Sequence, residues 1–137
     1  FMNIGCAGCH NGVVLGGQMF QKFGIVKDYW LATGSKEEEL LKGRDKGRFH
    51  DTKNEADAFI FKVQQLRNVA VTPPYFHDGS VATLGEAVRV MAAVQLGRED
   101  LSDDDVADIV AFLESLTGEV PANFAAAPVL PPAPYRN

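Results

Sequence analysis

The stretch that decides the fold is Cys6-Ala7-Gly8-Cys9-His10. A C-x-x-C-H pentapeptide is the attachment signature of c-type haem. Two thiols at this spacing can form thioethers with the two vinyl groups of one porphyrin, and the following histidine is then held beneath the iron. A redox dithiol or half of a zinc site would use the same cysteines, but the chain has no second cysteine pair. The motif therefore predicts covalent haem c, with Cys6 and Cys9 as anchors and His10 as an iron ligand.

Length and composition fit one globular domain with residues to spare for a tail. The chain has 137 residues, of which 46% are hydrophobic and 23% charged, so it carries enough apolar side chains to cover a haem. Its formal net charge of -5 argues against a nucleic-acid partner. No apolar run is long enough to span a membrane and no signal peptide is visible.

The haem motif suggests where the protein is located, and its position near the start of the chain suggests that the chain is part of a longer protein. Haem attachment of this kind takes place outside the cytoplasm, so we expect the periplasm of a bacterium. The first haem cysteine follows Phe1 almost at once, where a c-type domain normally has a helix. We therefore expect this chain to be part of a longer protein whose N-terminal part is absent.

Helical periodicity predicts two helices in the second half of the chain. The first covers residues 83–95 and ends at Gly97. Its apolar face is formed by Leu84, Ala87, Val88, Met91 and Val94. The second begins at Ser102, has Asp105 at the capping-box position, and is closed by Gly118.

The other segments are mainly predicted as loops. Residues 11–18 form a glycine-rich loop over one haem edge. Residues 20–34 contain a short strand or a turn, and the pattern does not distinguish the two. A short helix is expected at 35–41, a polar loop at 42–58, and a short extended stretch at 59–63.

These predictions combine into one fold class. We expect an all-α, cytochrome c-like haem domain with long loops over residues 1–118. Residues 119–137 are rich in proline and alanine and lack periodicity, so they are predicted to form an extended tail.

The ligand opposite His10 would decide the chemistry of the iron. A second strong ligand makes an electron carrier, whereas an open position permits peroxide or oxygen chemistry. The candidates are Met2, Met19, His50, His77 and Met91. Met2 is too close to the cysteines, and His50 lies in a polar, solvated stretch. Met19 stays open, and Met91 is equally well explained as a ligand or as a core side chain.

Several segments in order resemble one family, the bacterial dihaem cytochrome c peroxidases and their relatives of the methylamine-utilisation type. The resemblance runs across most of residues 5–118 and is to the C-terminal haem domain of the family. The matching segments are Gly5-Cys6-Ala7-Gly8-Cys9-His10-Asn11-Gly12, Leu15-Gly16-Gly17-Gln18, Gly47-Arg48-Phe49, Leu66-Arg67-Asn68-Val69-Ala70, Pro74-Tyr75-Phe76-His77-Asp78-Gly79, Met91 with Gln95-Leu96-Gly97, and Ile109-Val110-Ala111-Phe112-Leu113.

The resemblance implies a role for several of these residues. His10 and Met91 would be the axial ligands of a high-potential, electron-accepting haem. The methylamine-utilisation branch has a tyrosine in place of this methionine, so Met91 favours the peroxidase branch. His77 would order a loop at the haem edge or a domain interface rather than act as a base. Trp30 and Tyr75 would assist electron transfer or simply pack.

Two further binding roles come with the resemblance. The backbone carbonyls of Thr72 and Pro74 match those that hold a calcium ion between the two domains of the family. Family members usually have a different residue at the position of Pro73. Arg67 would pair with a haem propionate, the alternative being an ordinary surface arginine.

The resemblance also implies a reaction. The domain would take single electrons from a small donor, a c-type cytochrome or a cupredoxin, and pass them to a second haem in the missing N-terminal haem domain. Hydrogen peroxide would be reduced to water there, and the intact protein would form a homodimer. The alternatives are a stand-alone electron-transfer cytochrome, and a dihaem oxidase of the methylamine-utilisation type that acts on a protein or organic substrate.

Overall fold

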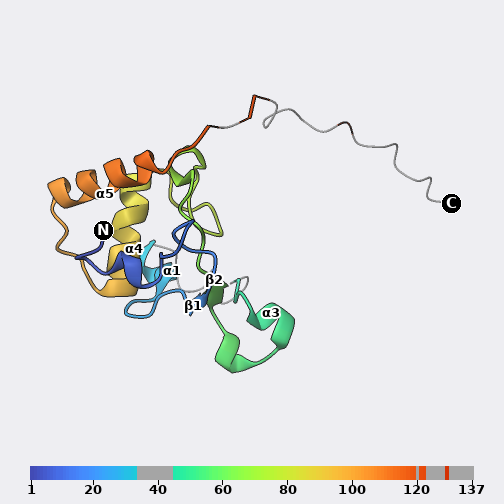
Figure 1. Cartoon of the computed structure of the whole chain (residues 1–137). Helices are drawn as coiled ribbons and strands as arrows, with labels where there is room; N and C mark the ends of the chain where they lie inside the picture. Colours follow the sequence, from blue (N-terminus) through green and yellow to red (C-terminus); the bar gives the residue numbers. More distant parts are fainter. Residues whose placement is uncertain (34–44, 120, 123–128, 130–137) are drawn as a thin grey trace.

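The centre of this molecule is a pair of helices to which long loops are attached. The computed structural model describes residues 1–33, 45–119, 121–122 and 129. Helices α4 (Leu84–Leu96) and α5 (Asp103–Ser115) pack against each other. Figure 1 shows them side by side, with the N-terminus of the chain close to them. No described helix is long and apolar enough to cross a membrane.

Both helices begin with a reciprocal capping box. At α4 the Thr83 side chain accepts from the backbone N–H of Glu86, whose carboxylate accepts from Thr83 in return. Ser102 and Asp105 do the same at α5. These bonds satisfy N–H groups that the first turn of a helix leaves without partners. The predicted cap at Ser102 is confirmed.

The ends of the two helices differ in how well the sequence predicted them. Gly97 adopts a left-handed φ of 66° and ends α4, as predicted. Helix α5 ends at Ser115, with Leu116 as its cap. The prediction that Gly118 closes α5 is therefore wrong by two residues, because the N–H of Leu116 already bonds back to the carbonyls of Leu113 and Glu114.

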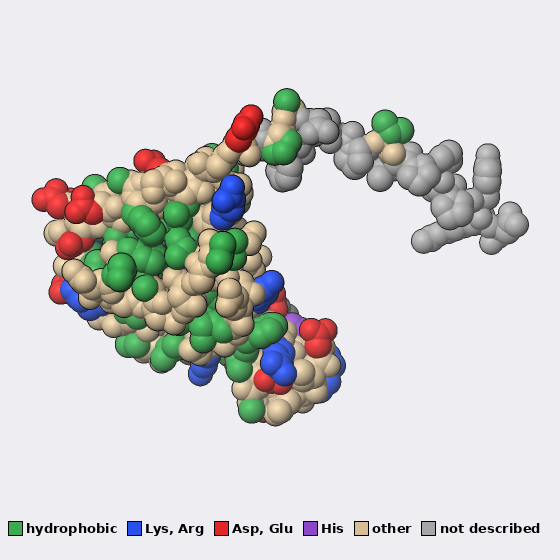
Figure 2. Space-filling view, in the orientation of Figure 1, with side chains coloured by type: hydrophobic (Ala, Val, Ile, Leu, Met, Phe, Trp, Pro, Cys, Tyr) green, Lys and Arg blue, Asp and Glu red, His purple; other side chains and the backbone are tan. Residues whose placement is uncertain are grey.

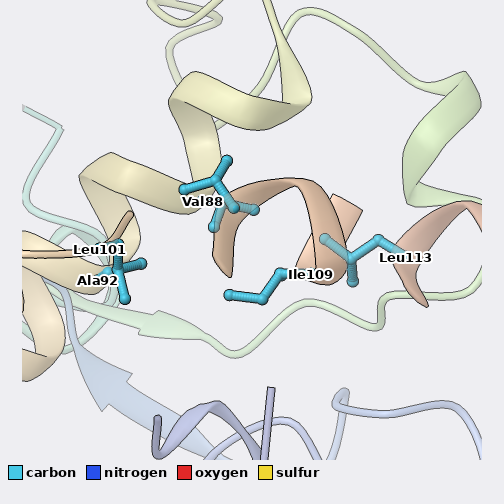
Figure 3. Packing of buried hydrophobic residues seen from close by; sticks show 6 residues of the cluster. Val88, Ala92, Leu101, Ile109 and Leu113 are labelled. Carbon is cyan, nitrogen blue, oxygen red and sulfur yellow. The ribbon is translucent and has the colours of Figure 1, made fainter. Parts of the chain in front are cut away.

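The main core lies between α4 and α5. Figure 3 shows Val88 and Ala92 on one helix turned toward Ile109 and Leu113 on the other. Partly buried side chains from the N-terminal segment and the 66–69 segment close the cluster. They include Phe1, Ile4, Leu66 and Val69. Of the apolar face predicted for α4, Leu84 and Val88 pack in this cluster and Ala87 packs in a smaller cluster, whereas Met91 belongs to neither.

The all-α prediction is wrong, because the loops contain a small antiparallel sheet. Strand β1 (Phe20–Lys22) pairs with β2 (Ile60–Lys62), with Gln21 opposite Phe61. The two segments are far apart in sequence, and pairing lets each satisfy backbone groups of the other. The predicted extended stretch at 59–63 is confirmed, and the ambiguous segment 20–34 contains a strand as well as helix α1 (Tyr29–Ala32).

The polar segment 42–58 is not simply a loop in the part that the structure describes. It contains the one-turn helix α3 (Phe49–Thr52) and the 3₁₀ turn η2 (Glu55–Asp57). The turn η2 is capped by Asn54, whose side chain accepts from the backbone of Ala56. Such short turns are held by local caps and have no hydrophobic period to reveal them.

Two predictions concern segments that are mostly not described. The helix at 35–41 lies outside the described residues. Of the predicted tail at 119–137, only residues 119, 121–122 and 129 are described. The division at residue 118 therefore stays a prediction.

Candidate haem site

The cysteine motif lies on a tight turn near the N-terminus. The 3₁₀ turn η1 (Cys6–Gly8) begins after Gly5, whose φ of 112° is a conformation that glycine adopts without strain. The backbone N–H of His10 donates to the carbonyl of Cys6 at 2.9 Å. The Asn11 side chain donates to two carbonyls of the turn. The three haem-binding residues of the motif, Cys6, Cys9 and His10, therefore lie on one compact, hydrogen-bonded turn.

The two cysteine thiols are free and partly buried. Desolvation by burial raises the pKa of the Cys6 thiol above its usual value. Among the described residues no group of three or more His, Cys, Asp or Glu side chains could hold a metal ion. The pair therefore lacks the additional ligands of a structural zinc site. Two unpaired thiols beside a histidine fit covalent haem.

His10 presents one particular nitrogen for a metal. Its Nδ1 lies 3.2 Å from the carbonyl oxygen of Gln64 and 3.4 Å from that of Leu15. A carbonyl can only accept, so Nδ1 carries the proton and Nε2 keeps its lone pair. Desolvation by burial lowers the pKa of His10, although both carbonyls oppose this effect. A neutral imidazole with a free Nε2 is the form that binds iron.

Met91 lies on α4 and is partly buried, but it belongs to neither of the two clusters of buried hydrophobic residues. The same helix passes close to the cysteine motif, because a Cβ on Gly5 would lie 3.5 Å from Leu96 Cδ2. The role of Met91 as the sixth ligand stays a prediction.

The other ligand candidates lie in unfavourable surroundings. Met2 is 78% exposed and Met19 is also exposed. His50 is exposed, and its Nε2 accepts a hydrogen bond from the backbone of Lys46 at 2.9 Å. An open hollow of about 470 Å³ beside α3 and β2 is partly lined by His50. None of Cys6, Cys9, His10 and Met91 lines it.

The Arg67 side chain lies beside the segment that follows α5. A Cβ on Gly118 would lie 2.7 Å from a guanidinium nitrogen of Arg67, so the arginine packs against that glycine. The neighbouring Asn68 side chain accepts from the N–H of Gly118 at 2.7 Å. Arg67 forms no ion pair with any described residue. Its guanidinium thus has no carboxylate partner within the described part of the chain.

The predicted calcium segment is exposed and has unused acceptors. Thr72 and Pro74 are both exposed, and the Pro73–Pro74 peptide bond is cis. The Thr72 hydroxyl donates to the carbonyl of Val69 at 3.1 Å. No described residue donates a hydrogen bond to the carbonyl of Thr72 or of Pro74. Both carbonyls are therefore free to bind a cation.

His77 lies in a group of aromatic rings, here called the aromatic cluster. Its members are Phe23, Tyr29, Trp30, Phe61, Phe76 and His77. The closest ring to His77 is Phe61, at 4.6 Å between centroids. Trp30 packs in this cluster, and Tyr75 lies in the smaller hydrophobic cluster with Val81 and Ala87. Both residues therefore take part in packing.

A buried hydroxyl holds the loop that carries His77, and the sequence did not reveal it. Tyr29 is 1% exposed, and its hydroxyl donates to Asp78 Oδ1 at 2.7 Å and lies 2.5 Å from Ser80 Oγ. The Asp78-Gly79-Ser80 run is a turn signal, but nothing in it indicates a distant tyrosine. Gln64 was missed because its contribution to His10 is a backbone carbonyl, which has no residue-type signature.

Comparison with known proteins shows which proteins this chain resembles. No family model matches it. It is 48% identical over 121 residues to the cytochrome c551 peroxidase of Pseudomonas aeruginosa, covering 88% of this chain and 33% of that protein. It is 46% identical over 133 residues to the cytochrome c551 peroxidase of Nitrosomonas europaea, covering 97% and 36%.

A solved structure is also similar. It is a MauG-like protein associated with microbial copper homeostasis, with a TM-score of 0.66, 28% identity, and coverage of 88% of this chain and 46% of that one. The chain spans about a third of the length of the two peroxidases. Its haem motif and the identity along most of its length lead to one conclusion: the chain is homologous to part of the bacterial cytochrome c peroxidases.

Proposed function

We propose that this chain is the electron-transfer haem domain of a dihaem cytochrome c peroxidase. The observation that carries the proposal is the state of His10, whose Nδ1 proton points to two carbonyls beside two unpaired thiols. The identity of 46–48% to these peroxidases supports the peroxidase assignment. Because the related peroxidases are about three times as long as their matched region, they have room for a second haem domain.

Each predicted ligand would contribute in a different way. Bound haem would supply a one-electron iron centre. Cys6 and Cys9 would fix it through thioether bonds, and His10 would bind through Nε2. Met91 would bind through its thioether sulfur, a weak donor that favours ferrous iron and so raises the reduction potential. This chain would then accept electrons and leave peroxide to another centre.

The reaction sets what the partners must supply. Reduction of one hydrogen peroxide to two waters consumes two electrons and two protons, so a one-electron donor must deliver twice per turnover. We propose a small c-type cytochrome or a cupredoxin as donor, and a second haem, in the N-terminal part of the intact protein, as the peroxide-reducing centre. The periplasm is the proposed location and a homodimer the proposed assembly.

Calcium and a propionate contact complete the proposal. The exposed carbonyls of Thr72 and Pro74 accept no hydrogen bond from described residues, as oxygen ligands for a hard cation require. Arg67 has no acidic partner among the described residues, so its guanidinium is available for a carboxylate.

A steady-state assay of the full-length protein tests this function. With hydrogen peroxide and a reduced small cytochrome, we expect two donor molecules to be oxidised per peroxide consumed. A stand-alone cytochrome would be reduced and reoxidised without peroxide turnover. A dihaem oxidase, suggested by the MauG-like structure, would consume peroxide without oxidising the cytochrome, and either result contradicts the proposal.

A further inference from the structure

The nearer hydrogen-bond acceptor of His10 comes from a distant part of the chain. The carbonyl of Gln64 lies 54 residues along the sequence and 3.2 Å from Nδ1, whereas Leu15 is five residues away and at 3.4 Å. The Leu15 carbonyl belongs to the same loop as His10. The position of the Gln64 carbonyl depends instead on how its segment docks on that loop.

Backbone hydrogen bonds on both sides of Gln64 dock the segment. The N–H of Gly17 donates to the carbonyl of Val63 at 2.7 Å. The N–H of Leu66 lies 3.2 Å from the carbonyls of both Val14 and Leu15. These hydrogen bonds on either side of Gln64 therefore fix the position of its carbonyl group relative to the loop that carries His10.

The approach is so close that only glycine fits at position 16. A Cβ on Gly16, which is buried, would lie 2.2 Å from the carbonyl oxygen of Gln64 and 2.9 Å from its carbonyl carbon. Both distances are far inside van der Waals contact, and the obstacle is backbone rather than a flexible side chain. Any side chain at this position must push the Gln64 carbonyl away. Gly16 thereby sets the distance between that carbonyl and His10.

The hydrogen bond to Nδ1 has a chemical consequence for the metal. A carbonyl that accepts the Nδ1 proton fixes the ring orientation and makes Nε2 a more basic donor. A more basic ligand stabilises the ferric state relative to the ferrous state, and hydrogen bonding around the ligands is one of the means by which proteins adjust haem potentials. Weakening this bond should raise the reduction potential.

We infer that Gly16 is a positioning residue for the proximal ligand: by lacking a side chain it lets the Gln64 carbonyl accept the His10 Nδ1 proton and holds the reduction potential of the haem below the value it would otherwise have. This inference rests on the proposed function, since it requires haem bound by His10.

The test compares two alanine variants of the full chain with haem attached. Gly16→Ala places a Cβ against Gln64. Gly17→Ala is the control, because its φ of 82° is also positive and strained for alanine, while its Cβ would meet only Gln65 Cβ at 4.0 Å. Redox titration followed by visible absorption should show an upward shift for Gly16→Ala that clearly exceeds any shift for Gly17→Ala. Equal shifts, or none, overturn the inference.

A second measurement on the unmodified protein covers the case in which Gly16→Ala does not fold. In the reduced, isotope-labelled protein, NMR should detect a through-hydrogen-bond coupling between His10 Nδ1 and the carbonyl carbon of Gln64. A coupling to Leu15 alone overturns the inference. Failure of the proposed function would look different, because it would show in the peroxide assay of the full-length protein while the reduction potentials of the two glycine variants still differed.

Discussion

At the scale of single residues, the chemistry depends on which nitrogen of His10 carries its proton. The motif identified His10 as a ligand, but only the structure shows two carbonyls at Nδ1. A sequence motif covers only neighbouring residues, and its residue types indicate which atoms can bind a metal. Acceptors such as the Gln64 carbonyl come from tertiary contacts, which no local pattern encodes.

The ligand opposite His10 can be tested by substitution. Met91→Ala should abolish the weak near-infrared band of methionine-ligated ferric haem and lower the reduction potential, because a weak thioether favours ferrous iron. Met19→Ala, which removes an exposed methionine, should leave both unchanged. Near-infrared absorption and redox titration measure the two effects. A band that survives in Met91→Ala and disappears in Met19→Ala would assign the ligand to Met19.

The Tyr29 hydroxyl should contribute measurably to stability. Tyr29→Phe removes a hydrogen bond to the Asp78 carboxylate, and we expect a loss of about 1.5–3 kcal/mol in the free energy of unfolding at neutral pH. Tyr75→Phe is the control, because the buried Tyr75 hydroxyl makes no hydrogen bond with a described residue. Urea denaturation should show a clearly smaller loss for the control. Equal losses would contradict the role of the hydroxyl.

The same contact should depend on pH. Desolvation raises the pKa of Asp78, but hydrogen bonds from Tyr29 and Ser80 outweigh it and leave the pKa below its usual value. The stabilisation is therefore present above the unfolded pKa of about 3.9 and is lost as the pH falls through the lower folded value. The difference between the unmodified protein and Tyr29→Phe should shrink between pH ~5 and pH ~3. A difference that stays constant over this range would contradict the account.

At the scale of elements, the sequence predicted what local rules determine. Helices α4 and α5 were found because their apolar period, capping boxes and Gly97 lie within a few residues of one another. The extended stretch at 59–63 was predicted, but its pairing with β1 was not, because each strand has only three residues and its partner is about 40 positions away. Short strands carry too few residues to show alternation, so their pairing is decided by tertiary structure.

The capping box at α5 gives an element-scale prediction. Ser102→Ala removes the acceptor for the N–H of Asp105 and should lower the free energy of unfolding by about 1 kcal/mol. Ser115→Ala, in the last turn of the same helix, removes only a hydroxyl that donates to the carbonyl of Phe112 and should cost less than about 0.5 kcal/mol. Urea unfolding of both variants checks this. The cap would lose its assigned role if Ser115→Ala were the more costly change.

At the scale of the whole molecule, one small core supports several long loops. The α4–α5 cluster also receives Phe1 and Ile4 from the segment ahead of the cysteine motif, and this links the site to the core. In Figure 2 the acidic side chains of the first turn of α5 gather at one end of the molecule. The sequence predicted this core from helical faces, but not the loop contacts that place His10 and His77.

The core residue Ile109 should be among the most sensitive positions. Ile109 is 4% exposed between α4 and α5, and Ile109→Ala should lower the free energy of unfolding by about 2–5 kcal/mol because it leaves a cavity. Leu31→Ala, at a side chain that is 64% exposed, should cost less than about 1 kcal/mol. Thermal or urea unfolding compares the two. Similar losses would show that the stability resides elsewhere.

The most direct test of the central claim is the haem content of the purified chain, made in a host that attaches c-type haem. The account predicts one covalent haem per chain, seen as a mass increase of one haem under denaturing conditions and as a c-type pyridine haemochrome spectrum. A Cys6→Ser and Cys9→Ser double variant should lose both signals. An unmodified chain of apoprotein mass with no Soret absorption would contradict the account.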